Sequence, residues 1–215
     1  MRLVALGLLA LSATADSQDP DRAPVSRGDR FRERSLGFSW HSPATGWGSV
    51  SHRRVYLTGI RTERVLGTHE SVAVSYFAEL VPLAVVERTA PNGYRCRSDY
   101  STAICRRDYS ARLAVGAGGS PIGVKLYFDR MRRLRPYASV AAGGLVFSNE
   151  VPSYNSRRLN FAGQASLGFD HVMRNGRAAT FGYRYHHISN GGTGRLNPGL
   201  DAHVVYIGVL DRRRR

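Results

Sequence analysis

Hydrophobic and polar positions alternate along most of the chain after residue 34, which is the pattern of β-strands with one buried face. Aromatic and β-branched residues are frequent in these segments, and glycine-containing turns such as Arg174-Asn175-Gly176 separate several of them. The pattern predicts eight or nine strands, at residues 36–41, 52–64, 71–80, 109–116, 124–128, 135–147, 160–173, 180–189 and 202–210.

Two of these segments are short and lie on either side of Gly118-Gly119-Ser120-Pro121, which has the composition of a turn. The segment around Val124 therefore fits either part of a broken strand or a small insert. A cluster of small residues, Ala138, Ala141, Ala142, Gly143 and Gly144, fits the interior of a narrow barrel.

A sheet of about eight antiparallel strands is expected to close on itself, because closure removes exposed edges. Strands of about ten residues can cross a membrane when tilted, and aromatic residues near the strand ends are typical of interfacial girdles. We predict an all-β fold, an eight-stranded antiparallel up-and-down membrane β-barrel over residues 35–211. A soluble β-sandwich or lipocalin-like barrel is the alternative.

The two ends of the chain have a different composition from the barrel. Arg2 precedes an apolar run that ends with Ala13-Thr14-Ala15, so residues 1–15 read as a secretory signal peptide. Residues 16–34 are polar and without periodicity, which indicates a flexible leader, and residues 212–215 form a basic tail. Elsewhere no apolar stretch approaches the roughly 20 residues of a membrane helix.

The chain has two cysteines, Cys96 and Cys105, in a polar stretch between predicted strands. After secretion they are expected to form a disulfide that closes a loop. We assign them no catalytic role, and the stretch does not supply the further ligands that a metal site needs.

Candidate chemistry is concentrated near the end of the chain. Because strand side chains alternate, His187 and Ser189 share one face of the strand at 180–189. If this strand and the next form a hairpin, Asp201 can face His187 across the ladder. The three residues then supply the nucleophile, base and orienting carboxylate of a serine hydrolase, which needs no metal or cofactor.

Other interpretations of these residues stay open on spacing alone. A His-x-Ser pair is common at protein surfaces, and Asn190 and Asn197 are residues that form turns by themselves. By parity His186 points to the opposite face, where it fits an interior hydrogen-bonding role. His203 shares the face of Asp201, but no second serine accompanies it.

The segments 182–190 (GYRYHHISN) and 197–201 (NPGLD) resemble the PagL-type lipid A 3-O-deacylases, which are outer-membrane acyl ester hydrolases. The resemblance implies that His187 is the base and Ser189 the nucleophile. The family acid is a glutamate fourteen residues after the histidine, where this chain has Asp201. Oxyanion or positioning roles are implied for Asn190, the backbone near Gly192, and Asn197.

The formal net charge is +15. Nucleic acid is not an expected partner, because a signal peptide and a barrel argue against it and the arginines are spread over loops and strand ends. Phosphate groups of lipid A fit Arg130, Arg132, Arg133 and Arg135 at one strand end and Arg157 and Arg158 at another, although each also fits a solvated loop.

The sequence thus favours an outer-membrane serine esterase that removes an ester-linked acyl chain from lipid A, with its triad on the lipid-facing side. Val205, Ile207 and Val209 on the face of Asp201 support that orientation. The alternatives are a non-catalytic barrel that binds lipid or has a structural role, and a soluble periplasmic carrier. Expected partners are lipopolysaccharide and outer-membrane lipids, and a homodimer is left open.

Overall fold

In the computed structural model the described residues are 24–43, 46–89, 94–99, 102–107 and 111–213, and for the segments 94–99 and 102–107 only the backbone is described. The described part contains ten strands. They are β1 (Arg30–Ser39), β2 (Arg53–His69), β3 (Val72–Arg88), β4 (Tyr94–Asp99), β5 (Thr102–Arg107), β6 (Leu113–Tyr127), β7 (Leu134–Val151), β8 (Arg157–Val172), β9 (Ala178–Ser189) and β10 (Leu200–Arg213).

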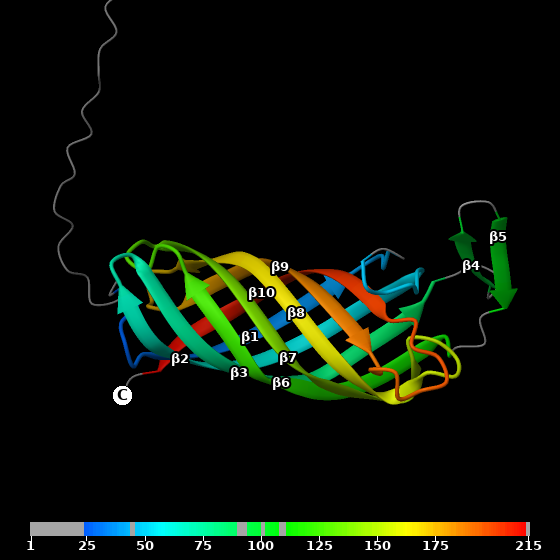
Figure 1. Ribbon diagram of the computed structural model, residues 1–215. Helices are drawn as coiled ribbons and strands as arrows, with labels where there is room; N and C mark the ends of the chain where they lie inside the picture. The colour runs from blue at the N-terminus through cyan, green and yellow to red at the C-terminus, as the bar shows by residue number, and fades with distance from the viewer. Residues whose placement is uncertain (1–23, 44–45, 90–93, 100–101, 108–110, 214–215) are drawn as a thin grey trace, which may run out of the picture.

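Eight strands form a closed barrel in the order β1-β10-β9-β8-β7-β6-β3-β2, and each pairs antiparallel with both neighbours (Figure 1). Strand β1 closes the ring, because Phe38 pairs with Tyr56 of β2 on one side and with Val205 of β10 on the other. This confirms the predicted eight-stranded up-and-down barrel. In the described residues no helix is long and apolar enough to cross a membrane.

The barrel is longer than the alternation predicted. Strand β1 begins at Arg30 rather than at residue 35, because alternating burial already starts there, and β10 continues to Arg213. The predicted leader is therefore partly barrel wall. The predicted signal peptide, residues 1–15, lies outside the described residues.

The segments predicted at 109–116 and 124–128 belong to one strand, β6. Its pairing with β7 shifts register between Gly119 and Ile122, so the glycine-rich segment is a β-bulge and not a turn. A Cβ atom on Gly118 would lie 2.1 Å from the Gly144 carbonyl oxygen. Glycine is needed here because the backbones of two strands approach closely.

Strands β4 and β5 form a separate two-stranded sheet within the predicted loop between β3 and β6. Their backbone register sets Cys96 directly opposite Cys105. The side chains of both cysteines lie outside the described part, so the disulfide stays a prediction.

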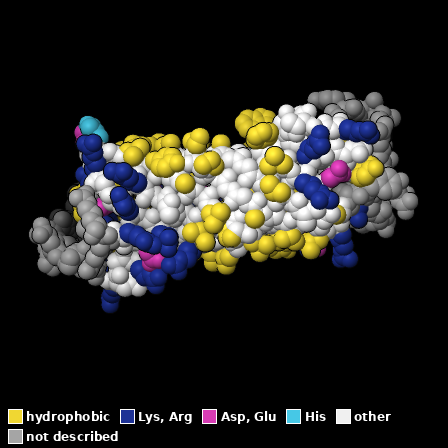
Figure 2. Space-filling view, turned by 90° about the horizontal axis from the view of Figure 1, so that it is seen from below, with side chains coloured by type: hydrophobic (Ala, Val, Ile, Leu, Met, Phe, Trp, Pro, Cys, Tyr) yellow, Lys and Arg dark blue, Asp and Glu magenta, His cyan; other side chains and the backbone are white. Residues whose placement is uncertain are grey.

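The outer wall of the barrel is apolar and the ends are basic. Exposed leucine, valine, isoleucine and aromatic side chains cover the wall, and Figure 2 shows hydrophobic side chains over its middle with lysine and arginine side chains gathered at both ends. Ala138 and Ala142 also lie on this outer wall, whereas Ala141 points inward. The expectation that this whole cluster of small residues fills the interior was therefore wrong, since alternation divides it between both faces.

The interior is filled by side chains in layers. Apolar clusters occupy both ends of the lumen. Between them Arg61 lies 3.5 Å from Glu33 and 3.4 Å from Glu79, and Glu79 also binds Arg184 at 3.1 Å. Paired charges thus fill the layer between the two apolar clusters.

Connections between the strands differ in length at the two ends of the barrel. Residues 70–71, 128–133 and 173–177 make short turns at the end where Arg30 and Arg213 also lie. At the opposite end the connections include 40–52, 89–112 with its β4–β5 hairpin, and 190–199. The β9–β10 hairpin turns at this long-loop end.

Candidate active site

The β9–β10 hairpin places all three predicted catalytic residues at the long-loop end of the barrel. The ladder pairs Asp201 directly with His187. Strand parity puts Tyr183, Tyr185, His187 and Ser189 on the outer face of β9, while Arg184 and His186 point into the lumen. The candidate site therefore faces outward, away from the buried charge network.

An acid–base pair is already formed in this hairpin. His187 Nδ1 lies 2.6 Å from Asp201 Oδ1, and the Asp201 side chain is fully buried. A carboxylate at this position holds the Nδ1–H tautomer of the imidazole, which leaves Nε2 free to accept a proton. The family that this segment resembles has a glutamate at this position. Here the shorter aspartate side chain still reaches the imidazole, because Asp201 and His187 are direct ladder partners.

Ser189 lies two residues beyond His187 on the same outer face and is partly buried. Its ladder partner on β8 is Phe161. Within the described residues the Ser189 hydroxyl makes no hydrogen bond. The structure thus brings the serine and the His187–Asp201 pair to one surface, with the hydroxyl available to a substrate.

The turn after Ser189 is organised by the side chain of Asn190, which is fully buried. Its Nδ2 donates to the Leu196 carbonyl at 2.7 Å, and its Oδ1 accepts from the Gly192 backbone N–H at 3.0 Å. The Gly192 N–H is therefore occupied inside the turn. Both residues act in positioning here, and neither is oriented as an oxyanion donor.

Asn197 is placed differently. Its Oδ1 accepts a hydrogen bond from the Asn190 backbone N–H at 3.0 Å, which fixes the amide group one residue from Ser189. The side chain is exposed, and its Nδ2 donates to no other described residue. Of the three predicted oxyanion residues, Asn197 has an available donor.

A loop that sequence reasoning did not assign to the site covers Asp201. The Gly48 backbone N–H donates to Asp201 Oδ2 at 2.7 Å, so both carboxylate oxygens are bound. The Ser49 N–H donates to the Pro198 carbonyl at 2.6 Å, which ties the β1–β2 loop to the β9–β10 loop. No alternation or motif marks Gly48, because its contact joins segments 153 positions apart.

Aromatic rings flank the candidate base. The Trp47 ring packs edge-on against His187, with centroids 5.8 Å apart, and against Tyr185 at 6.3 Å. On the neighbouring strand β10, His203 contacts the hydroxyl and ring of Tyr183. His203 thus lies among aromatic side chains on the outer wall. His186 is buried in the lumen, where its ring nitrogens have no partner among the described residues.

Comparison with known proteins adds an independent finding. The model of the lipid A 3-O-deacylase (PagL) family matches residues 89–209, which is more than half of the chain and includes β9 and most of β10. Comparison with curated proteins gives no match.

Solved structures of outer-membrane proteins are similar to this chain. The outer membrane enzyme PagL is 13% identical, covers 83% of this chain and 97% of its own, and has a TM-score of 0.56. Neisserial surface protein A (10% identity, 85% and 97% coverage, TM-score 0.47) and OprG from Pseudomonas aeruginosa (12%, 88% and 98%, 0.42) are also similar. Because the family model matches more than half of the chain, the chain belongs to the lipid A 3-O-deacylase (PagL) family and is an outer-membrane protein.

Proposed function

We propose that this protein is a serine esterase that removes an ester-linked acyl chain from lipid A at the outer face of its barrel. The observation that carries the proposal is the 2.6 Å contact between His187 and Asp201 on the same outward surface as Ser189, inside the segment that the family model matches. Ser189 is the proposed nucleophile, His187 the general base and Asp201 its orienting carboxylate.

In the proposed reaction Ser189 Oγ attacks the ester carbonyl carbon while His187 Nε2 takes the hydroxyl proton. Collapse of the tetrahedral intermediate breaks the bond to the sugar oxygen, which leaves as an alcohol with the proton from His187. Water, deprotonated by His187, then attacks the acyl-enzyme and releases the carboxylic acid, and the proton returns to Ser189. Asp201 stays ionised throughout.

Asn197 is the proposed side-chain donor to the oxyanion. The hydrogen bond from the Asn190 N–H to Asn197 Oδ1 holds this exposed amide next to the residue that follows Ser189, and its Nδ2 donates to no described residue. A donor held in advance at the developing negative charge is worth a hundredfold or more in rate. Asn190 and Gly192 support this role indirectly, because their mutual hydrogen bond shapes the turn that carries Asn197.

The position of the site fits a substrate in the outer leaflet. Outer-membrane barrels have short periplasmic turns and long extracellular loops, so the long-loop end is placed outside. Exposed arginines at this end, Arg157, Arg158 and Arg195, offer contacts to headgroup phosphates. The Arg157 Nε–H donates to the Thr193 carbonyl at 3.0 Å, which keeps this cation beside the loop that follows Ser189.

The test is deacylation of lipopolysaccharide by the purified protein in detergent, followed by mass spectrometry of lipid A. We expect loss of one hydroxyacyl mass with the wild type and none with Ser189→Ala or His187→Asn. Matched controls are Ser148→Ala and His171→Asn, which lie on other strands and are expected to keep wild-type activity. A wild type that changes no lipid A mass would indicate a non-catalytic barrel instead.

A further inference from the structure

Arginine side chains gather on the outer wall at the short-turn end of the barrel, across β1, β2 and β10. The outward positions 30, 32 and 34 of β1 are all arginine. With their neighbours they form what we call the arginine patch, which consists of Arg30, Arg32, Arg34, Arg64, Arg177 and Arg213. Figure 2 shows lysine and arginine side chains gathered at this end, next to the hydrophobic side chains of the wall.

Three arginines of the patch are direct neighbours in the strand ladder. Arg30 pairs with Arg64 of β2 on one side and with Arg213 of β10 on the other. Like charges at directly opposite positions destabilise a sheet. None of the three forms an ion pair with another described residue. This row therefore carries an excess of positive charge that a bound anion would offset.

The next row of the ladder contains a donor without a partner. Arg32 lies between Thr62 and Asp211, yet its Nε is buried and has no hydrogen-bond partner among the described residues. Asp211 instead binds Arg177 at 2.5 Å and Arg34 at 3.5 Å. Guanidinium groups bind phosphate oxygens in a defined, often bidentate geometry. A phosphate group at this patch would accept from Arg32 and reduce the repulsion in the neighbouring row.

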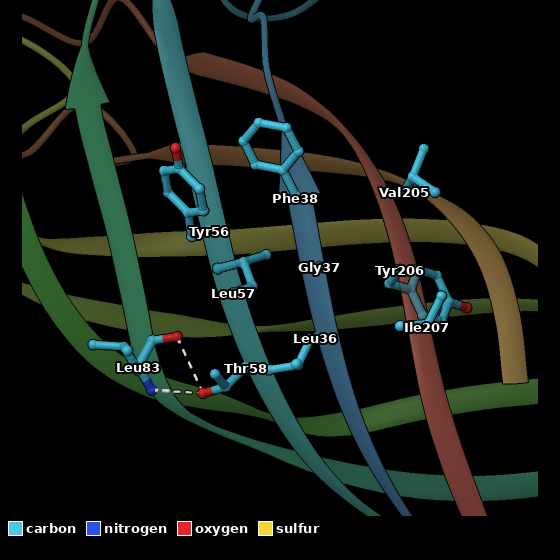
Figure 3. Close-up of a pocket in the computed structure, with 10 residues that line it drawn as sticks. All are labelled: Leu36, Gly37, Phe38, Tyr56, Leu57, Thr58, Leu83, Val205, Tyr206 and Ile207. Atoms are coloured by element: carbon cyan, nitrogen blue, oxygen red, sulfur yellow. Dashed lines mark hydrogen bonds between the residues drawn. The ribbon is translucent and has the colours of Figure 1, made fainter. Parts of the chain in front are cut away.

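An apolar groove of about 400 Å³ begins beside the patch and crosses β10, β1 and β2 (Figure 3). Leu36, two residues beyond Arg34 on β1, lines it together with its ladder partners Thr58 and Ile207. The Thr58 hydroxyl donates to the Leu83 carbonyl at 3.3 Å and accepts from the Leu83 N–H at 3.1 Å. Both backbone groups of Leu83 are thus paired, as contact with hydrocarbon requires.

The patch and the candidate active site lie at opposite interfaces of the membrane. Asp201 and Asp211 are ten residues apart on β10, which is about 33 Å at about 3.3 Å per residue. With a strand tilt of about 40° this gives a depth of about 25 Å, the height of the apolar band of such barrels. Short turns of outer-membrane barrels face the periplasm, so the patch lies at the headgroup level of the periplasmic leaflet.

We propose that the arginine patch and this groove form one binding site for an anionic phospholipid of the periplasmic leaflet. The arginines bind the phosphate group, and an acyl chain lies in the groove. A free phosphate would use only the patch, whereas the continuity of patch and groove fits a lipid. A net negative headgroup fits better than a zwitterionic one, because an ammonium group would meet the arginines. The site does not depend on the proposed esterase, since it lies at the other interface and binds without a reaction.

The test measures, by native mass spectrometry, the lipid bound to the purified full-length protein in detergent. Phosphatidylglycerol and phosphatidylethanolamine with identical acyl chains are added in equal amounts. We expect a bound ratio of about ten or more in the wild type and of about two or less in Arg30→Gln/Arg32→Gln. The matched control Arg54→Gln/Arg112→Gln removes two exposed arginines at the long-loop end, and its ratio is expected to stay within about twofold of wild type.

The groove is tested by a second pair of variants. Ile207→Trp places a bulky ring in the groove, and Ile122→Trp makes the same change on the outer wall of β6, away from it. We expect bound phosphatidylglycerol to fall about fivefold or more in Ile207→Trp and to stay unchanged in Ile122→Trp. Excess inorganic phosphate is expected to displace no more lipid than sodium chloride of the same ionic strength.

Each other outcome would overturn the proposal. A wild-type ratio near one would show no preference for a negative headgroup, and an equal fall in both arginine pairs would show attraction by the overall charge only. Displacement by inorganic phosphate would indicate an anion site without lipid. Selective replacement of phosphatidylglycerol by lipopolysaccharide would assign the arginines to lipid A phosphates. If Arg30→Gln/Arg32→Gln does not fold, Arg64→Gln on the neighbouring strand decides with the same readout.

Discussion

At the scale of single residues, the site differs from the family pattern at Asp201, an aspartate where the family has a glutamate. Both oxygens of its carboxylate are bound, one to His187 Nδ1 at 2.6 Å and the other to the Gly48 N–H at 2.7 Å. The side chain is fully buried, so its surroundings fit an aspartate closely. The shorter acid is therefore compensated by the direct ladder pairing and by a loop that closes over it.

This fit predicts that glutamate, the family residue at this position, does not raise the activity of this protein. Asp201→Glu adds a methylene where the β1–β2 loop leaves no room, so we expect at least a tenfold lower kcat on lipopolysaccharide. Asp201→Asn keeps the shape but favours the wrong imidazole tautomer, and we expect a loss of about 10³-fold or more. Steady-state rates check both, with Asp211→Asn near the short-turn end as control. A faster Asp201→Glu enzyme would show that the loop does not confine the carboxylate.

Gly48 gives a second prediction at this scale. In Gly48→Ala the new Cβ would lie 2.7 Å from the Asp201 backbone nitrogen, so the loop must move and its N–H must leave Asp201. Loss of a hydrogen bond to a charged group costs about 1.5–3 kcal/mol, so we expect kcat to fall about tenfold to a hundredfold. Gly67→Ala, whose Cβ would meet nothing within 4 Å, is the matched control. Equal rates for the two variants would argue against a role for the loop.

Parts of the site differ in how far sequence could predict them. His187, Ser189 and Asp201 follow from alternation and from the motif, because parity alone sets their common face. The contribution of Gly48 could not be predicted, since a backbone N–H carries no residue signature. The family resemblance implied oxyanion or positioning roles for both Asn190 and Asn197, but both are also turn formers, and only their hydrogen bonds distinguish the two roles.

At the scale of elements, the β9–β10 hairpin and its turn act as one unit. The strands were predictable because inward and outward positions alternate over most of their length. Strand β6 was not, because Gly118 and Gly119 resemble a turn, although they allow close approach of β3 and β7. Glycine occurs both in turns and where two backbones approach closely, and only the neighbouring strands show which of the two applies.

The turn itself is expected to be essential. Asn190→Ala removes the bonds to Leu196 and Gly192 but leaves the barrel ladder intact, so Asn197 loses its support. We expect activity to fall about tenfold to a hundredfold while the protein still migrates as a folded barrel in unheated gels. Asn149→Ala, which removes a side-chain bond to Leu113 at the same end of the barrel, is the control. Unchanged activity in Asn190→Ala would mean that the turn holds its shape without this side chain.

At the scale of the whole molecule, the barrel wall separates structure from chemistry. Buried ion pairs such as Lys125 with Asp170, at 2.9 Å, fill the lumen, and the candidate residues stand outside it. In the proposed function the substrate therefore approaches from the bilayer without entering a pore. The wall also carries apolar grooves, so in the proposed function lipid contact and catalysis share one surface.

This arrangement requires that the long-loop end face the cell exterior, which chemical labelling tests. Arg195 is exposed in the loop after Ser189, and Arg132 is exposed in a short turn at the opposite end. In intact cells a membrane-impermeant maleimide is expected to label Arg195→Cys and to reach Arg132→Cys only after the outer membrane is permeabilised. The unmodified protein, with Cys96 and Cys105 predicted to be paired, serves as the background. The reverse labelling pattern would place Ser189 in the periplasmic leaflet, where outer-leaflet lipid A could not reach it.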